Sequence, residues 1–312
     1  MKAVVYQRYG PPEVLQVRDV PRPEPDANEV LVHVHASTVT RTDCGVRSAR
    51  PFFARLFTGL LRPKQPIAGM EFAGEVASVG KAVTAFAPGD RVFGVRSGAN
   101  AEYVSVRERG AIARMPAGLS FEQAAAVADG GCSALSTLRQ ARLQAGQRVV
   151  VYGASGSIGT AAVQVAKHQG AHVTAVCGPN ALDLARSLGA DAVVDYTRED
   201  YAARGEKYDL VYDAVGKSSY RRCRRALNRD GLYMTMDGGF LWHAPLLALV
   251  SKRVKLGVAR YRQEDVKTLA TMIEAGAYQP VIDRTYPLDE ALEATRYVET
   301  GQKTGNVVLA LP

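Results

Sequence analysis

Apolar residues in the first part of the chain form short runs that Gly and Pro interrupt. The runs cover residues 3–6, 30–35, 72–79 and 103–106. Short runs that alternate or cluster apolar residues, bounded by Gly and Pro, are typical of β-strands. The turn signal Pro88-Gly89-Asp90 leads into a further apolar run. Residues 1–119 are therefore predicted to form a β-rich domain.

The pattern changes at Ser120, where Ser with Gln123 three residues later forms a capping-box signal for a helix start. Beyond it, predicted strands at residues 148–152, 171–176, 192–195, 210–213 and 231–236 alternate with predicted helices at 158–169, 181–188 and 220–227. This alternation predicts a doubly wound parallel sheet with crossover helices over residues 120–279. After Pro280 a strand (281–286), a helix (288–300) and a strand (306–311) follow, and we expect residues 280–312 to rejoin the first domain.

The strand predicted at residues 148–152 leads directly into a glycine-rich turn that opens a helix. Small residues there let the backbone turn tightly, let a pyrophosphate approach main-chain N–H groups, and let the helix pack on the strand. A tight turn without a ligand is the alternative. The strand before the turn, the helix after it and the next strand, predicted at residues 171–176, favour a nicotinamide dinucleotide. The residues expected to bind it here are Ala154, Gly156, Ser157, Ile158 and Gly159.

The end of the second strand bears on the choice between NAD and NADP. An acidic residue there would bind the ribose 2′-hydroxyl and favour NAD. The segment from Cys177 to Asn180 contains no acid, and it contains no Arg or Lys either. We therefore expect NADPH, with NADH possible, and contacts from Cys177 and Asn180.

Composition adds limits on class and compartment. The 312 residues are 47% hydrophobic and 22% charged, as expected for a globular protein of about two domains. The net charge of +8 is spread along the chain, and its one cluster, at residues 221–225, resembles a solvated helix face, so no nucleic-acid partner is expected. The four cysteines form no C-x-x-C pair, no apolar stretch is long enough to span a bilayer, and the N-terminus resembles no signal, so we expect a cytoplasmic protein.

Several segments together, in this order and spacing, resemble the medium-chain dehydrogenase/reductase superfamily and its zinc-independent quinone oxidoreductase branch, which includes zeta-crystallin. They are residues 36–43, 69–74, 88–92, 101–103, 153–159, 188–191 and 305–308. The resemblance implies a GroES-like β-rich catalytic domain, discontinuous in sequence, together with a Rossmann domain. It also implies a homodimer formed through an edge strand near residues 253–260, although that strand is alternatively a covered edge.

Zinc-dependent relatives hold a catalytic metal at three positions of this pattern. Here those positions carry Thr40, Met70 and Ala128 or Asp129. A catalytic zinc needs three protein ligands, and Thr and Met are poor ones. Cys132 lies a few residues past the third position and is more typical of a small buried residue than of a ligand. No metal is therefore expected.

The resemblance also implies roles for single residues. Thr40 stands where the branch often has Asn near the nicotinamide, so we expect it to donate a hydrogen bond to the substrate; an ordinary strand-end hydroxyl is the alternative. Asp43 and Glu71 are expected to be structural. Further cofactor contacts are implied at Ser133, Tyr196, Val215, Gly216, Gly238 and Asn306, the last of which stands where relatives often have Lys.

Without a metal to polarise a carbonyl, the acceptor must take hydride readily. A quinone or an α,β-unsaturated carbonyl does so at a conjugated carbon, and the resulting oxyanion needs only a hydrogen bond and a proton. We therefore predict NADPH-dependent reduction of such an acceptor. Reduction of a 2-enoyl thioester, and a structural protein that binds cofactor with little turnover, are the alternatives. Residues 50–64 are expected to cap the substrate, or else to contact a membrane or a partner.

Overall fold

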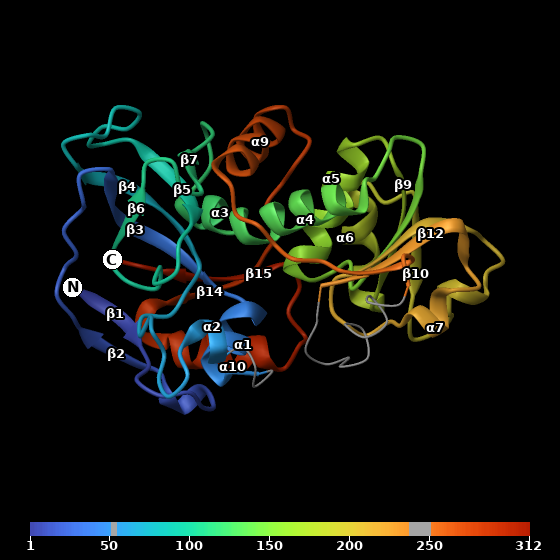
Figure 1. Ribbon diagram of the computed structural model, residues 1–312, viewed down its shortest axis with the longest axis horizontal. Helices are drawn as coiled ribbons and strands as arrows, with labels where there is room; N and C mark the ends of the chain where they lie inside the picture. The colour runs from blue at the N-terminus through green and yellow to red at the C-terminus, as the bar shows by residue number, and fades with distance from the viewer. Residues whose placement is uncertain (51–54, 237–250) are drawn as a thin grey trace. The chain divides into compact units, whose positions relative to one another are not determined.

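The computed structural model describes residues 1–50, 55–236 and 251–312, without the side chain of Phe57 (Figure 1). It divides into two compact units. Unit 1 comprises Met1–Asp129, Tyr261–Ala275 and Pro280–Pro312, and unit 2 comprises Gly130–Arg260 and Gly276–Gln279. Each unit contains one main β-sheet, and the predicted combination of a GroES-like sheet with a parallel Rossmann-like sheet is confirmed. The domain boundaries at residues 119 and 279 stay a prediction.

The main sheet of unit 1 has the strand order β14-β15-β3-β4-β5-β7, and β6 pairs with β3 outside this path. Its strands are β3 (Glu29–Val39), β4 (Glu71–Val79), β5 (Arg91–Val95), β6 (Tyr103–Arg107), β7 (Ile112–Arg114), β14 (Ile282–Pro287) and β15 (Asn306–Ala310). A separate antiparallel pair joins β1 (Lys2–Val5) to β2 (Gln16–Asp19). β15 pairs with β3, with Val308 opposite Thr38, so the last strand of the chain belongs to this sheet.

The helices of unit 1 are α1 (Arg41–Ser48), α2 (Arg55–Thr58), α3 (Phe121–Ala125), α9 (Gln263–Glu274) and α10 (Ala291–Glu299), with short 3-10 turns at Pro12–Val14 (η1) and Leu288–Glu290 (η5). The capping box predicted for α3 is present, since the Ser120 hydroxyl accepts from the Gln123 N–H. Alternate residues of β3, Val30, Val32 and Val34, are buried in the core of the unit. Leu31, between the first two, is buried as well, so burial along this strand follows the apolar run more than a strict period of two.

The sheet of unit 2 is parallel, with the strand order β10-β9-β8-β11-β12-β13. Its strands are β8 (Arg148–Tyr152), β9 (His172–Cys177), β10 (Ala192–Asp195), β11 (Tyr208–Asp213), β12 (Leu227–Thr235) and β13 (Val254–Leu256). The chain winds outward from β8 to one edge and then from β11 to the other, which is the Rossmann order. The switch point between β8 and β11 is where such sheets bind dinucleotides.

The helices of unit 2 are α4 (Ala128–Ala141), most of which lies in this unit, α5 (Ser157–His168), α6 (Leu182–Ser187) and α7 (Tyr220–Cys223), with 3-10 turns η3 (Pro179–Ala181) and η4 (Tyr201–Ala203). In Figure 1, α5 and α6 lie beside the parallel sheet, where α5 contacts β8 and β9. The helix predicted at residues 220–227 is shorter than expected, because β12 already begins at Leu227. Over the described residues, no helix is both long and apolar enough to cross a membrane.

Candidate functional site

The glycine turn at the end of β8 leaves no space for larger residues at two positions. Gly153 has φ +80°, and a Cβ there would lie 2.6 Å from Val215 Cγ1. A Cβ on Gly159, in the first turn of α5, would lie 2.0 Å from the carbonyl oxygen of Gly153. Glycine at Gly153 therefore lets the turn approach Val215, and glycine at Gly159 lets α5 approach the turn, more closely than any side chain allows.

The N-terminus of α5 presents backbone groups at the switch point. Its N-cap is Gly156, which has no side chain to cap the helix. A Cβ on Gly156 would meet only the carbonyl oxygen of Gly153, at 3.7 Å, so the approach to this residue is open. Ser157 and Ile158 are the first two residues of the helix. First-turn N–H groups lack intrahelical acceptors and lie at the positive end of the helix dipole, so this turn fits a pyrophosphate.

The loop after β11 lies against the same turn. Asp213, fully buried at the end of β11, holds the loop by accepting from the N–H groups of Val215 (3.2 Å), Lys217 (3.3 Å) and Ser218 (2.8 Å). Burial raises the pKa of Asp213. Gly216 has φ +66°, a conformation that favours glycine. The structure therefore brings the expected residues Val215 and Gly216 to the Gly153 turn.

The carboxyl ends of β9 and β10 also meet. The N–H of Tyr196 donates to the carbonyl of Cys177 (3.2 Å), and a Cβ on Gly178 would lie 3.6 Å from the Tyr196 hydroxyl. Tyr196 is 52% exposed, and Asn180 is exposed as well. Cys177 is buried, so only its backbone faces this edge.

Arg198 supplies a cation at this edge that sequence reasoning missed. It lies two residues after Tyr196, its side chain is 85% exposed, and its Nε lies 3.6 Å from the Asp195 carboxylate. The end of β9 itself carries no Arg or Lys. Because neighbouring parallel strands end at the same edge, an Arg shortly after β10 could have been predicted from the sequence to lie near the end of β9.

Two other expected cofactor contacts in unit 2 have a different outcome. Ser133 lies within α4 and is only 1% exposed, and its carbonyl accepts from the Thr137 hydroxyl (2.6 Å). This burial disfavours a direct contact between the Ser133 side chain and a ligand. Gly238 lies outside the described residues.

Thr40, expected to be the substrate hydrogen-bond donor, is the N-cap of α1. Its hydroxyl donates to Asp43 Oδ2 (2.8 Å) and accepts from the Asp43 N–H (3.1 Å). Burial raises the pKa of Asp43 to about 7. The hydroxyl proton of Thr40 is directed at Asp43, so Thr40 caps α1, and its expected hydrogen bond to the substrate stays a prediction.

Two buried carboxyl groups lie near this helix start in unit 1. Glu71 accepts from the Thr38 hydroxyl (2.6 Å) and from the Asp129 N–H (2.6 Å). The Asp129 carboxylate accepts from the Tyr261 hydroxyl (2.6 Å). Burial, followed by the charge of Asp129, raises the pKa of Glu71. The pair therefore joins β4, the start of α4 and the segment before α9 within unit 1.

Asn306, the other expected cofactor contact, binds backbone carbonyls. Its side-chain amide donates to the carbonyls of Ala126 (2.9 Å) and Val281 (3.1 Å). Both bonds hold the main chain of unit 1, and the cofactor contact of Asn306 stays a prediction. Lys303, three residues earlier, is partly buried and donates to the carbonyl of Gly305. Burial lowers the pKa of Lys303 to about 8.

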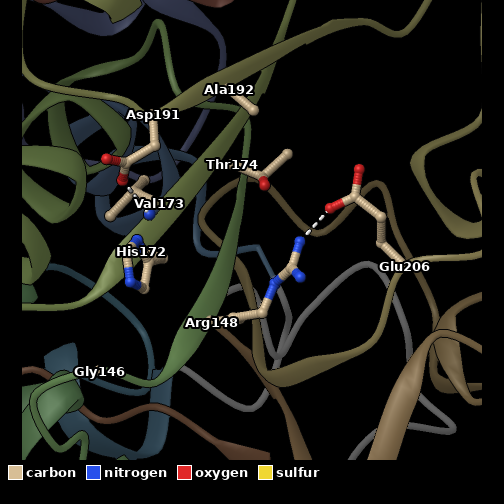
Figure 2. Close-up of a pocket in the computed structure, with 8 residues that line it drawn as sticks. All are labelled: Gly146, Arg148, His172, Val173, Thr174, Asp191, Ala192 and Glu206. Atoms are coloured by element: carbon tan, nitrogen blue, oxygen red, sulfur yellow. Dashed lines mark hydrogen bonds and ion pairs between the residues drawn. The ribbon is translucent and has the colours of Figure 1, made fainter.

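A cavity of about 420 Å³ lies at the amino ends of the parallel strands in unit 2 (Figure 2). Its lining residues are Gly146, Arg148, His172, Val173, Thr174, Asp191, Ala192 and Glu206. Figure 2 shows the ion pair between Arg148 and Glu206, and the Asp191 carboxylate accepting from the Val173 N–H. Parallel sheets bind dinucleotides at the carboxyl ends of their strands, so this cavity is not the cofactor site.

Thr40 and Met70 occupy two of the positions that hold zinc in related enzymes. Thr40 caps a helix, and Met70 is partly buried at the residue before β4. In residues 1–50, 55–236 and 251–312, no group of three or more His, Cys, Asp or Glu side chains is arranged to hold a metal ion. A metal-free protein stays a prediction.

Comparisons with known proteins agree with the fold. Residues 26–117 match the alcohol dehydrogenase GroES-like domain, and residues 188–309 match the family described as zinc-binding dehydrogenase. A 2-methylene-furan-3-one reductase from Solanum lycopersicum is 30% identical over 99% of this chain and 79% of its own length. An NADPH-dependent alkenal/one oxidoreductase from Arabidopsis thaliana, chloroplastic, is 31% identical over the same shares.

A solved structure gives the same assignment. The quinone oxidoreductase from Coxiella burnetii is 28% identical, covers 100% of this chain and 99% of its own, and superposes with a TM-score of 0.87. Its likeness extends over both units. Together with the relatives above, it shows that the chain belongs to the medium-chain dehydrogenase/reductase family, in the group that contains the quinone and alkenal oxidoreductases.

Proposed function

We propose that this chain uses NADPH to reduce a quinone or an α,β-unsaturated carbonyl compound. The observation that carries the proposal is the turn at the switch point of unit 2, where Gly153 and Gly159 admit only backbone and α5 begins without a side-chain cap. This arrangement fits a dinucleotide pyrophosphate. When bound, the cofactor supplies the hydride. The names of the relatives support this acceptor class.

The preference for NADPH rests on the carboxyl end of β10. Tyr196 lies beside Gly178, and the exposed guanidinium of Arg198 follows two residues later. A guanidinium binds phosphate through short, charge-assisted hydrogen bonds. No carboxylate occurs between Gly178 and Asn180 to repel a 2′-phosphate. We therefore assign the 2′-phosphate to the edge formed by Tyr196 and Arg198.

The oxidation of NADPH should be measured against a panel of quinones, alkenals and enoyl-CoA thioesters. Turnover of a quinone or an alkenal is the expected result. Turnover of the thioester alone would favour the 2-enoyl thioester reductase alternative. Tight NADPH binding without turnover of any acceptor would contradict both enzymatic functions and favour a structural protein. About one zinc per chain after purification would contradict the metal-free expectation.

Two finer expectations belong to this proposal. β13 (Val254–Leu256) is the last strand in the order of its sheet, and an open strand edge can pair with a second copy, so we propose a homodimer there. Light scattering of the purified protein tests it. The four cysteines are free and buried, which suits a reducing compartment such as the cytoplasm. Fractionation of cells tests that location.

A further inference from the structure

An exposed apolar cluster lies on unit 1, on α2 and in the turn that follows it (Figure 1). This leucine patch consists of Leu56, Leu60 and Leu61, which are 69%, 60% and 87% exposed. Over the described residues, the other large apolar side chains that are exposed all lie in unit 2: Tyr196, Val215 and Val258. Single exposed apolar residues are normal, but a cluster within six residues indicates a surface that contacts an apolar partner.

The turn that carries Leu60 and Leu61 is held in shape. The N–H of Lys64 donates to the carbonyl of Thr58 (2.8 Å), which closes the turn. At its base, the Tyr9 hydroxyl donates to the carbonyl of Gly59 (2.7 Å). Gly59 has φ +125°, a conformation that favours glycine. The closed turn therefore presents its two leucines to solvent on a fixed base.

The sequence around the leucine patch is basic. Residues 44–70 contain five Arg and Lys residues but no Asp or Glu. Three of these cations, Arg50, Arg62 and Lys64, are exposed, and the last two lie in the same turn as the leucines. Cations beside exposed apolar side chains complement an anionic lipid surface, because the headgroups attract the cations and the acyl region accepts the leucines.

Other occupants account for fewer of these features. A nucleic acid would bind the cations but leave the leucines in water. A cap over an apolar substrate would use the leucines but gives no reason for a long segment without a carboxylate. In a twofold contact between two copies of the chain, the same patch faces itself, so Arg62 and Lys64 would meet like charges. An anionic membrane is the occupant that uses both the leucines and the cations.

We propose that the leucine patch, with Arg62 and Lys64, binds the surface of an anionic membrane. Leu60 and Leu61 insert between the headgroups, and the two cations bind lipid phosphates and carboxylates. This binding needs neither cofactor nor acceptor, so it does not depend on the proposed function. For a reductase of apolar quinones or enones, it would place the enzyme beside acceptors that are dissolved in the lipid.

Flotation with vesicles measures this binding. The parent protein should float with vesicles of phosphatidylserine and phosphatidylcholine in equal parts, and much less with pure phosphatidylcholine. Leu60→Ser/Leu61→Ser should weaken the binding at least about tenfold, because two apolar side chains no longer leave water. Arg62→Gln/Lys64→Gln should weaken it about 25-fold, since each cation near an anionic surface contributes about fivefold.

Matched controls change exposed positions of unit 2. Val258→Ser removes an apolar side chain, and Arg221→Gln/Arg224→Gln removes two charges; both variants should bind the vesicles within about twofold of the parent protein, because they lie outside the patch. A parent protein that does not float with the anionic vesicles would overturn the proposal. Patch variants that float as well as the parent protein would overturn it too.

Insertion of the turn has its own spectroscopic signature. On the anionic vesicles, the added fluorescence of Leu61→Trp should shift to shorter wavelength and be quenched by brominated lipid, whereas that of Val258→Trp should not. Trp242 is common to both variants and is subtracted with the parent spectrum. Equal spectra with and without vesicles for Leu61→Trp would contradict insertion.

The other occupants give different results. A parent protein that stays in solution, together with a higher KM of Leu60→Ser/Leu61→Ser for a water-soluble quinone, would assign the patch to a substrate cap. Loss of a dimer in that variant, measured by light scattering, would assign the patch to a second copy instead. A parent protein that floats with the anionic vesicles but reduces no acceptor would contradict the proposed function alone.

Discussion

Gly159 shows how one missing side chain determines a binding site. Its Cβ position is occupied by the carbonyl oxygen of Gly153, only 2.0 Å away. The carbonyl cannot move without displacing Ala154 and the end of β8, whose hydrogen bonds to β9 hold the turn. A side chain at residue 159 would therefore both destabilise unit 2 and distort the turn that is expected to bind the cofactor.

We predict that Gly159→Ala forces the turn apart. Overpacking of this kind costs about 1–3 kcal/mol in the free energy of unfolding, and NADPH affinity should fall by at least about tenfold. Gly156→Ala is the matched variant for stability, because its Cβ would meet only one atom, at 3.7 Å. Thermal melting and fluorescence titration measure the two effects. Equal melting temperatures for both variants would contradict this prediction and show that the turn accommodates the added methyl group without a loss of stability.

Arg198→Gln should separate the two cofactors. Loss of a charge-assisted bond to phosphate costs about 1.5–3 kcal/mol, and we expect the lower end because Arg198 is exposed, so NADPH should bind about tenfold more weakly while NADH binding is unchanged. Arg221→Gln, an exposed arginine on α7, is the control for net charge. An equal loss for NADH and NADPH would place the 2′-phosphate elsewhere.

Single-residue roles were the least predictable part of the site. The motif at residues 153–159 identified the turn because its requirement is local: small residues between a strand and a helix. Thr40 and Asn306 were assigned to ligands, but their partners are Asp43 in one case and the carbonyls of Ala126 and Val281 in the other. Partners 25 and 180 residues away are not visible in a single sequence.

At the scale of elements, the regular patterns were the most informative. β8 and β10 have the predicted bounds, because their apolar runs are short and end at polar or glycine residues. α1 was missed, although Thr40 and Asp43 form a capping box, because the residues before them continue the apolar pattern of β3. α9 was missed as well, since Arg262 at its N-cap provides no side-chain cap.

The capping box of α3 gives a prediction for one element. The Ser120 hydroxyl accepts from the Gln123 N–H (3.2 Å), and Gln123 accepts from the Ser120 N–H (3.0 Å). Ser120→Ala should destabilise the helix by about 1 kcal/mol. Ser187→Ala, whose hydroxyl only binds a carbonyl within α6, should change stability by less than about 0.5 kcal/mol. Hydrogen exchange of the α3 amides and urea unfolding measure these effects, and unchanged exchange in Ser120→Ala would contradict the first.

For the whole molecule, buried carboxyl groups set the pH dependence of stability. The pKa of Asp43 rises from 3.8 to about 7, and that of Glu71 from 4.5 to about 8. The folded chain therefore binds these protons more tightly than the unfolded chain does. Their contribution to stability is fully present below the unfolded pKa and is lost as the pH rises through the folded pKa.

We predict that the free energy of unfolding falls between pH 5 and pH 8. Each group contributes at most about 1.4 kcal/mol per pH unit. Glu71→Gln should reduce this slope, because the amide does not titrate, whereas Glu75→Gln, at an exposed position on the same strand, should not. Denaturant unfolding at several pH values gives the slopes. A slope unaffected by Glu71→Gln would assign the dependence to other groups.

The place of β15 has a consequence for the order of events during synthesis. β15 lies between β14 and β3, so the main sheet of unit 1 is interrupted until residues 306–310 are present. Unit 2 is complete once residue 279 has emerged from the ribosome. On a growing chain the nucleotide-binding half can therefore fold first, while residues 36–39 of β3 still lack their partner strand on one side. An unpaired strand edge can pair with another chain, so we expect misassembly of this protein to be most frequent between neighbouring nascent chains on a polysome.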